Sequence, residues 1–269
     1  MAKSSSSKPH TTRRRALITG ASAGIGAAFA RRLARDRYDL VVVARGRDRL
    51  AELAEQLRAD HGGAVEVLPA DLTHAAELHV VEKLVADADL DLLVNNAGFG
   101  TVGAFARLDP AKEEEEIRLN VVALARLTRA ALPGMIARRR GRIINVSSMA
   151  AFQAAPYNAT YAATKAFVNS FTEALYEELR GTGVVVQALC PGFTRTEFQE
   201  RAGIDVSDIP SFAWMSPDAV VETSLRALQR GELICIPGLA NRALMTLTSA
   251  VPRSITRRVF GTLSKRFVR

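Results

Sequence analysis

Short runs of β-branched and other apolar residues alternate with longer stretches of helical periodicity through most of this chain. The alternation is typical of a parallel sheet whose two faces are both covered by helices. Strands buried on both sides are continuously apolar, and the run Leu40–Ala44 has that character. We therefore predict an α/β fold with a doubly wound, Rossmann-like sheet of seven parallel strands.

The predicted elements follow one another in βα order. The seven strands are expected at Arg15–Thr19, Leu40–Ala44, Val65–Pro69, Leu90–Val94, Arg142–Val146, Val184–Leu189 and Leu233–Ile236. Helical periodicity covers Gly26–Arg35, Asp48–Asp60, Thr73–Ala86, Glu113–Arg138, Tyr161–Arg180 and Pro217–Arg230. The acidic run Glu113–Glu116 is interpreted as a solvated first turn of its helix, where the helix dipole favours negative charge.

A chain of 269 residues lies near the upper limit for one hydrophobic core, and no linker-like stretch interrupts its middle. We predict one domain over residues 14–238, with a disordered tail at 1–13 and a basic, amphipathic extension at 239–269. Residues 193–216 have no regular pattern and carry several large apolar side chains, so they are expected to form a substrate lid. Cys190 and Cys235 lie in apolar runs and are expected to be buried free thiols.

The net charge of +8 comes from the two ends of the chain. Residues 1–15 hold five Lys/Arg and residues 241–269 hold seven, with no acidic residue in either segment, so the body is mildly acidic. This distribution argues against a basic groove, and no nucleic-acid partner is predicted. The tail lacks the apolar segment of a signal peptide, and no run approaches the length of a membrane span, so a cytoplasmic protein is expected.

The extension at 239–269 mixes apolar residues with basic ones and is divided by Pro252. An amphipathic basic segment can lie on an anionic membrane surface, so peripheral membrane contact is one interpretation. Packing against a neighbouring subunit is a second, and a helix that completes the substrate pocket is a third. The sequence leaves these alternatives open.

Tyr161 and Lys165 are four residues apart in a predicted helix, so their side chains share one face. A nearby ammonium favours the ionised form of a phenol, and we expect Lys165 to lower the pKa of Tyr161 toward neutrality. Ser148 follows a predicted strand and could donate a hydrogen bond to the oxygen that the tyrosine protonates. Reduction of a carbonyl group by hydride requires this combination.

The first predicted strand runs into a glycine-rich loop that is followed by a helix. Gly20, Gly24 and Gly26 permit a tight turn and the close approach of backbone amides to a pyrophosphate at the helix N-terminus. The second strand ends without the carboxylate that would bond the ribose of NAD, and Arg45 follows it. Arg45, with Arg47 as a second contact, therefore predicts NADP(H) in preference to NAD(H).

Two further strand ends carry candidate cofactor contacts. The carboxylate of Asp71 could accept from an adenine amino group, and a flat cofactor could lie along Asn95-Asn96-Ala97-Gly98. Helix capping by Asp71 and an ordinary turn at the second site are the alternatives. The four histidines show no metal-ligand spacing, so no metal site is predicted.

From Arg15 to about Gly238, the chain resembles the single-domain branch of the short-chain dehydrogenase/reductase family. The resemblance rests on Thr19-Gly20-x-x-x-Gly24-x-Gly26, Asn95-Asn96-Ala97-Gly98, Asn120, Ser148, Tyr161-x-x-x-Lys165 and Pro191-Gly192. It implies a catalytic tetrad of Asn120, Ser148, Tyr161 and Lys165. The expected cofactor contacts are Gly20, Ser22, Gly24, Ile25, Gly26, Arg45, Asp71, Leu72, Asn96, Ala97, Gly98, Tyr161, Lys165, Pro191, Gly192 and Thr194.

The resemblance also implies a role for each member of the tetrad. Tyr161 would exchange the proton, Ser148 would steady the developing oxyanion, and Lys165 would bond the nicotinamide ribose. Asn120 would hold a water that resupplies protons. Ser147 competes for the serine role, and Ser148 is preferred because its spacing to Tyr161 is the usual one in the family.

The function predicted from these features is NADP(H)-dependent hydride transfer between nicotinamide and a hydrophobic ketone or secondary alcohol. A long-chain or 3-oxoacyl substrate would suit the apolar lid and the extension. The alternative is a non-catalytic NADP(H) sensor or interaction protein on the same fold. The family commonly assembles through the helices around Glu113 and Tyr161, so a homodimer or homotetramer is expected.

Overall fold

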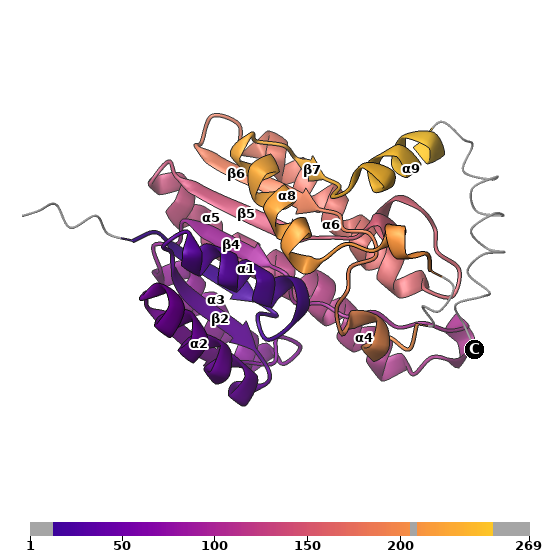
Figure 1. Ribbon diagram of the computed structural model, residues 1–269, viewed down its shortest axis with the longest axis horizontal. Helices are drawn as coiled ribbons and strands as arrows, with labels where there is room; N and C mark the ends of the chain where they lie inside the picture. The colour runs from indigo at the N-terminus through magenta and orange to yellow at the C-terminus, as the bar shows by residue number, and fades with distance from the viewer. Residues whose placement is uncertain (1–12, 205–208, 250–269) are drawn as a thin grey trace, which may run out of the picture.

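Seven parallel strands form one sheet in the order β3-β2-β1-β4-β5-β6-β7, which confirms the predicted fold class (Figure 1). The computed structural model describes residues 13–204 and 209–249. The predicted tail therefore lies outside the described residues except for Arg13, as does the extension beyond Ser249. The strands are β1 (Arg15–Thr19), β2 (Asp39–Ala44), β3 (Val65–Pro69), β4 (Leu92–Asn95), β5 (Gly141–Val146), β6 (Val184–Leu189) and β7 (Ile234–Cys235).

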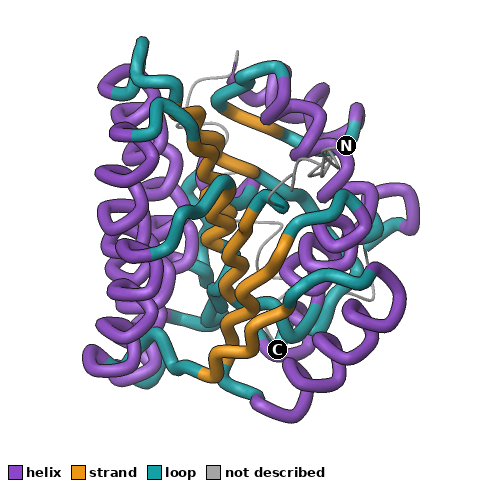
Figure 2. Tube along the Cα trace, turned by 90° about the vertical axis from the view of Figure 1, so that its left-hand side faces the viewer, coloured by secondary structure: helices purple, strands orange, loops and turns teal. Residues whose placement is uncertain are grey.

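Helices cover both faces of this sheet, as Figure 2 shows. The α-helices are α1 (Gly24–Arg35), α2 (Arg47–His61), α3 (Ala75–Asp87), α4 (Pro110–Ile117), α5 (Leu124–Ala137), α6 (Ala159–Glu178), α7 (Phe198–Arg201), α8 (Pro217–Gln229) and α9 (Leu239–Ser249). Shorter helical turns are η1 (Phe105–Arg107), η2 (Arg118–Ala123), η3 (Met149–Phe152) and η4 (Ser211–Ala213). Apolar residues of α1, α2 and α8 pack on one face of the sheet, and those of α3, α5 and α6 pack on the other.

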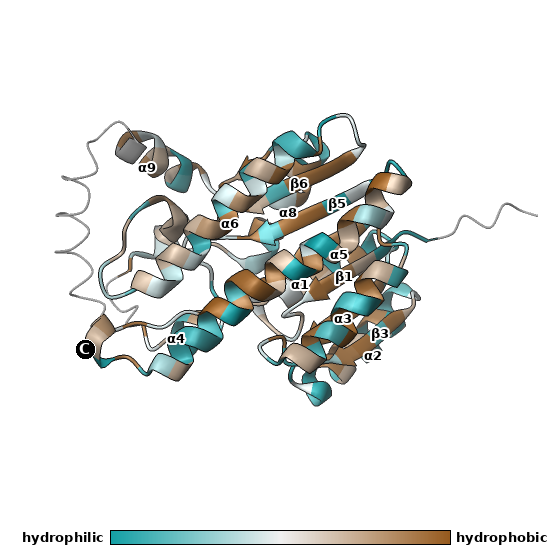
Figure 3. Cartoon of the chain, turned by 180° about the vertical axis from the view of Figure 1, so that it is seen from behind, coloured by the Kyte–Doolittle hydropathy of each residue, from teal (hydrophilic) through white to brown (hydrophobic). Residues whose placement is uncertain are grey.

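Alternating side chains of each strand supply the two core layers. Ile18 and Val42 point into the layer beneath α1, whereas their neighbours Leu17 and Val41 point into the layer beneath α5. The strands are apolar along both faces for this reason, which Figure 3 shows as brown strands between partly teal helices. Cys190 and Cys235 are buried free thiols, as predicted.

The strand order reverses between β1 and β4, which lie side by side in the sheet. Ligands of open α/β sheets bind at such a switch point, beyond the carboxyl ends of the strands. The segments that follow β1, β4, β5 and β6 all start at this edge because the strands are parallel. Every motif singled out in the sequence therefore begins at one end of the sheet.

The predicted helix Glu113–Arg138 is interrupted by a π-helical turn. The α-helical segments α4 and α5 are joined by η2, which is π-helical and contains Asn120. π-turns inside helices are rare and are found mostly at functional sites. Among the described residues, one helical run, Pro110–Ala137, has the length and the apolar composition that a membrane-spanning helix needs. We interpret it as a core helix, since Leu127, Ala131 and Met135 of α5 are buried against the sheet.

The prediction of a solvated acidic turn at Glu113–Glu116 is wrong for two of its four residues. Glu113 is 8% exposed and Glu116 is fully buried, whereas Glu114 and Glu115 make surface ion pairs with Arg118 and Lys112. Residues three apart share a helix face, and this face of α4 turns inward onto the segment after β4. Burial of a carboxylate requires hydrogen-bond donors, and both side chains have them.

Candidate active site

The start of α1 is shaped to receive an anion. Ala23 occupies the N-cap, so no side chain caps the first amides, and no acidic residue stands in the first turn. Gly20 has φ of +66°, and a Cβ at Gly26 would lie 2.2 Å from the carbonyl oxygen of Gly20. The two glycines are therefore required for the tight turn itself. Ser22 and Ile25, also predicted as contacts, lie in the same turn.

Thr19 joins the loop after β1 to the loop after β4. Its hydroxyl oxygen accepts from the backbone N–H groups of Asn96 and Ala97, both at 3.0 Å. The Asn96 side-chain amide donates back to the carbonyl oxygens of Thr19 and Gly20. The expected cofactor residues 96–98 are thereby locked to the glycine loop, and the sequence analysis had not assigned this role to Thr19.

Arg45 and Asp71 lie together at the ends of β2 and β3. The nearest guanidinium nitrogen of Arg45 is 3.9 Å from the Asp71 carboxylate, and the Arg45 side chain is 73% exposed. Asp71 accepts from the backbone N–H and the hydroxyl of Thr73. Burial opposes ionisation of Asp71, but the hydrogen bonds from Thr73 and the charge of Arg45 lower its pKa overall. Arg47 begins α2 and is exposed, and Leu72 is buried.

The two serines after β5 have different neighbours. The Ser147 hydroxyl is buried and donates to the backbone carbonyl of Lys165 at 3.1 Å. Ser148 caps η3 by accepting from the N–H of Ala150, and its hydroxyl is close enough to Tyr161 to lower the pKa of the phenol. Ser147 thus anchors α6, while Ser148 reaches the phenol.

Tyr161 and Lys165 share one face of α6, with the Lys165 ammonium 5.6 Å from the centre of the Tyr161 ring. The ammonium is buried and donates to the carbonyl oxygen of Val146 at 2.9 Å. Burial raises the pKa of Tyr161 to about 12, although the hydrogen bond from Ser148 acts in the opposite direction. The expected fall of the Tyr161 pKa toward neutrality is therefore not found, because desolvation of the phenolate is the largest cause of the shift.

Asn120 occupies the π-helical turn and is buried. Its amide oxygen accepts from the N–H of Phe99, and its amide nitrogen donates to the Phe99 carbonyl and to the Thr164 hydroxyl. A Cβ at Gly98 would lie 2.8 Å from the Asn120 amide oxygen and 3.4 Å from the Lys165 ammonium. The structure thus brings Asn120 and Lys165 together beside Gly98.

The predicted lid lies against the same loops. A Cβ at Gly24 would lie 3.0 Å from the methyl group of Thr196. Phe198, in the short helix α7, packs on the Tyr161 ring with centroids 5.5 Å apart. The salt bridge from Arg49 to Glu197, at 2.9 Å, joins the lid to α2. The segment was expected to be irregular throughout, but it contains α7 and η4 in its described parts.

Pro191, Gly192 and Thr194 follow β6 at the carboxyl edge of the sheet. The Thr194 hydroxyl donates to the Gly192 carbonyl, and the Pro191 carbonyl accepts from the N–H of Met149. Asn241 of α9 lies against this segment, since a Cβ at Gly192 would be 2.7 Å from its amide. The start of α9 therefore lies against the segment that follows β6.

Glu113 and Glu116 are the largest omission from the predicted site. Both are hydrogen-bonded to Thr101, close behind the Tyr161 and Lys165 pair. A sequence signal existed, because Glu116 stands four residues before Asn120 and shares its helix face. The acidic composition of the run concealed this spacing.

Comparison with known proteins identifies the family of this chain. The family model described as short chain dehydrogenase matches residues 14–206. The chain belongs to the short-chain dehydrogenase family. Its members are oxidoreductases, which accords with the crevice, the uncapped α1 and the phenol at its mouth.

Individual members of the short-chain dehydrogenase family resemble this chain over most of its length. A short-chain dehydrogenase from Sphingobium yanoikuyae in complex with NADPH is 40% identical, with a TM-score of 0.80, over 89% of this chain and 97% of that one. A family member from Burkholderia phymatum in complex with NAD is 26% identical, with a TM-score of 0.77, over 87% and 92%. The ketoacyl reductase HetN of Nostoc sp. is 33% identical over 79% of this chain and 74% of its own length.

The residues present fit a nicotinamide dinucleotide. The uncapped start of α1 offers backbone amides to a pyrophosphate, while Gly98 and Gly100 let Lys165 and Tyr161 pack close to the backbone after β4. These features support the binding of a nicotinamide cofactor by a short-chain dehydrogenase.

Proposed function

We propose that this protein is an NADP(H)-dependent oxidoreductase that interconverts a hydrophobic ketone and its secondary alcohol. The observation that carries the proposal is the Tyr161 phenol, whose pKa the nearby Ser148 hydroxyl lowers, and whose ring adjoins Lys165 and packs against Phe198 of the predicted lid. A proton donor and a second hydroxyl meet there at the mouth of a dinucleotide crevice. A site used only for cofactor sensing would not need this pair.

The chemistry assigned to the chain is proton transfer and charge stabilisation. When bound, the nicotinamide supplies hydride to the carbonyl carbon, or accepts it in the reverse direction. Tyr161 donates its phenolic proton to the carbonyl oxygen, and Ser148 donates a hydrogen bond to the same oxygen. Lys165 would offer its ammonium to the ribose of a bound cofactor, and Asn120 holds the backbone of Phe99 close to Lys165.

Arg45 supports the preference for NADP(H). Its exposed guanidinium lies at the end of β2, 3.9 Å from Asp71, and its position suits a 2′-phosphate. The relative with NADPH bound is 40% identical to this chain, and the relative with NAD bound is 26% identical.

The proposed substrate is an apolar ketone or a 3-oxoacyl group. Phe198 faces Tyr161, and Phe193 packs on Trp214 with ring centroids 5.6 Å apart, so the lid contributes aromatic surface near the phenol. The similarity to a ketoacyl reductase points the same way. The buried free thiols Cys190 and Cys235 suit a reducing, cytoplasmic setting.

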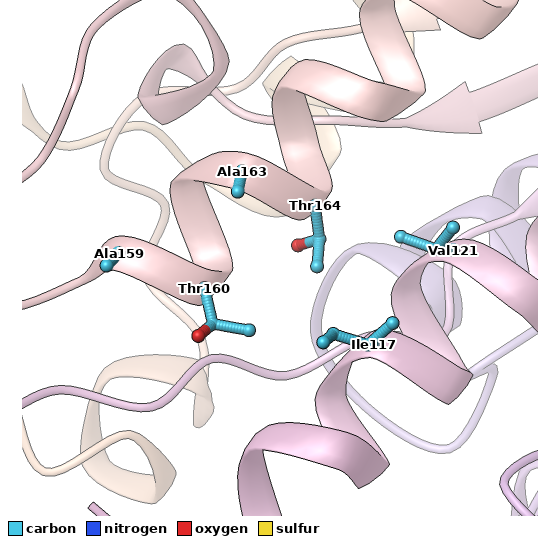
Figure 4. Close-up of a pocket in the computed structure, with 6 residues that line it drawn as sticks. All are labelled: Ile117, Val121, Ala159, Thr160, Ala163 and Thr164. Carbon is cyan, nitrogen blue, oxygen red and sulfur yellow. The ribbon is translucent and has the colours of Figure 1, made fainter. Parts of the chain in front are cut away.

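A homo-oligomer is proposed from the outer face of α4, η2 and α6. Ile117 and Val122 are 45% and 41% exposed, and Phe105 is 64% exposed. Figure 4 shows a shallow pocket on this face, with Ile117 and Val121 opposite Thr160 and Thr164. An exposed apolar patch of this kind marks an interaction surface, and a second copy of the chain is the proposed partner.

The test is turnover by purified protein with NADPH and ketones of graded chain length, including 3-oxoacyl thioesters. We expect turnover that rises with the apolar size of the ketone. Tyr161→Phe should lower kcat by about 10²–10⁴-fold while leaving NADPH affinity nearly unchanged. Full activity in Tyr161→Phe would show that another group donates the proton. Tight NADPH binding with no turnover of any ketone would instead favour a sensor.

A further inference from the structure

Glu116 is a buried carboxyl group whose hydrogen bonds are incomplete. Its Oε2 accepts from the backbone N–H of Thr101 at 2.9 Å and lies 2.8 Å from the Thr101 hydroxyl. Its Oε1 is buried and has no hydrogen-bond partner among the described residues. The side chain is fully inaccessible to solvent. A carboxylate in such a place is costly unless a positive charge lies nearby.

The Thr101 hydroxyl lies between two carboxyl groups. It is 2.5 Å from Glu113 Oε1 as well as 2.8 Å from Glu116 Oε2, and Glu113 also contacts the Thr160 hydroxyl. One hydroxyl has one proton, so it can donate to only one carboxylate and must accept from the other group. Both contacts are hydrogen bonds only if one carboxyl carries a proton. The two buried carboxyl groups therefore share one hydroxyl donor.

Hydrogen bonds and packing place this carboxyl pair behind the proton donor. Thr101 follows Gly100, where a Cβ would lie 2.8 Å from the Tyr161 ring. Asn120 stands one helical turn after Glu116 and donates to the hydroxyl of Thr164, the neighbour of Lys165. Glu116 therefore faces the side of α6 that carries Tyr161 and Lys165.

Lys165 needs an anion that the described hydrogen bonds do not supply. Its ammonium donates to a neutral carbonyl, Val146, and makes no direct ion pair in the described part of the chain. Burial lowers the pKa of Lys165 to about 8, while the charge of Glu116 raises it and that of Cys190 acts in the same direction. Burial raises the pKa of Cys190 to about 12, so this thiol is neutral at physiological pH. Glu116 is thus the acid whose negative charge, once it is ionised, acts on Lys165.

The same charge acts on Tyr161. Burial is the main reason that the pKa of Tyr161 is raised, and Glu116 adds to the increase because a carboxylate opposes formation of a phenolate. Burial also raises the pKa of Glu116 itself to about 7, with Thr101 and Lys165 opposing and Glu113 reinforcing the shift. The charged or titratable groups that face Glu116 are therefore Glu113 on α4 and Tyr161 and Lys165 on α6.

We propose that Glu116 is the counter-ion of Lys165, a positioning residue that keeps the Lys165 ammonium and the Tyr161 phenol protonated. The relation bears on turnover only through the proposed carbonyl reductase function. Ketone reduction needs both protons in place, and Glu116 retains them up to a higher pH. Since Glu116 is ionised only above about pH 7, its influence is present above that pH and fades below it.

The pH dependence of ketone reduction follows from the directions of these pKa shifts. Replacing Glu116 with glutamine removes the negative charge and keeps the size of the side chain. The pKa values of Lys165 and Tyr161 should then both fall, so the alkaline limb of kcat/KM for reduction should move down by about one pH unit. Below pH 7 the variant and the wild-type protein should have similar profiles. Glu114→Gln is the matched control, because Glu114 is on the same helix but is 64% exposed and paired with Arg118.

A direct readout uses the lysine titration rather than activity. The chain has six lysines, so protein labelled with ¹³C at lysine Cε gives few signals, and the Lys165 signal is identified by its loss in Lys165→Met. In wild-type protein this signal should show a first inflection near pH 7 from Glu116 and a second from Lys165 itself. In Glu116→Gln the first should vanish and the second should move down by about one pH unit.

Each outcome decides the proposal. An unchanged Lys165 midpoint in Glu116→Gln, or an equal shift in Glu114→Gln, would overturn it. If Glu116→Gln fails to fold, the wild-type titration decides alone, and a Lys165 signal with no inflection near pH 7 overturns the proposal. A shifted Lys165 midpoint in protein that reduces no ketone would leave the counter-ion in place and refute the reductase function instead.

Discussion

The Phe198 ring packs against the Tyr161 ring, with centroids 5.5 Å apart and ring planes inclined by 48°. The two residues are far apart in the chain, and Phe198 belongs to the short helix α7 of the lid. A Cβ at Gly100 would touch both side chains, at 2.8 Å from the tyrosine and 3.4 Å from the phenylalanine. The predicted lid therefore contacts the proposed proton donor directly through Phe198.

Phe198→Ala should weaken the use of apolar ketones. Loss of one aromatic wall removes about 1.5–3 kcal/mol of burial, so kcat/KM for a long-chain ketone should fall by about tenfold or more, chiefly through KM. Phe198→Leu should retain most of the activity. The comparison is steady-state kinetics with a long and a short ketone, and an equal loss for both would contradict a role in substrate contact.

Arg45→Ala should weaken NADPH binding and leave NADH binding nearly unchanged. A charge-assisted contact to a 2′-phosphate contributes about 1.5–3 kcal/mol, which corresponds to a tenfold to hundredfold increase in the Kd for NADPH. Fluorescence titration with both cofactors measures the difference. NADH serves as the internal control, and a similar loss for the two cofactors would place the 2′-phosphate elsewhere.

Thr19→Val should destabilise the fold at the crevice. The hydroxyl accepts from two backbone N–H groups, those of Asn96 and Ala97, and valine leaves both without this acceptor. The expected loss is about 1–3 kcal/mol in the free energy of unfolding, measured by urea denaturation. Thr19→Ser keeps the acceptor and should lose less. Equal losses in the two variants would assign the effect to packing of the methyl group.

Glu116→Gln should alter the pH dependence of stability. The folded pKa of Glu116 is raised to about 7 from 4.5, so folding favours its protonated form, and the stability this contributes is lost as the pH rises through 7. Glutamine cannot ionise, so the variant does not lose this stability at high pH. Relative to wild type, the variant should gain about 3 kcal/mol in free energy of unfolding at pH 8 and little at pH 4.5. Urea denaturation at both pH values measures this, and a gain that is the same at both would contradict the burial of an ionisable group.

The strands were the most predictable part of the structure. β1, β3 and β6 have the predicted bounds, because a parallel strand covered on both faces is a short, continuous apolar run. β4 begins two residues later than predicted. Leu90 is buried but lies before the strand, and Asp91 turns its carboxylate to the N–H of Arg15 and to Arg140. Apolar character marked this segment correctly, and a side-chain hydrogen bond moved its start.

The candidate site was predictable where a role follows from local spacing. Tyr161 and Lys165 share a helix face because they are four residues apart, and a glycine at position 20 accommodates a positive φ. Ser147 and Ser148 could be told apart from the sequence only by a family spacing. In the structure the Ser147 hydroxyl donates a hydrogen bond to the backbone of α6, so Ser148 is the serine that remains beside the Tyr161 phenol.

The sequence by itself determined the order of the strands and helices, the glycine turn and the face on which Tyr161 and Lys165 meet, since these depend on periodicity and on backbone sterics. Only the tertiary structure decided that Glu116 is buried, that Phe198 covers Tyr161 and that the pKa of Tyr161 is raised. Desolvation and charge depend on which distant segments pack around a group. The residues around Glu113–Glu116 do not by themselves predict that the loop after β4 packs over Glu116.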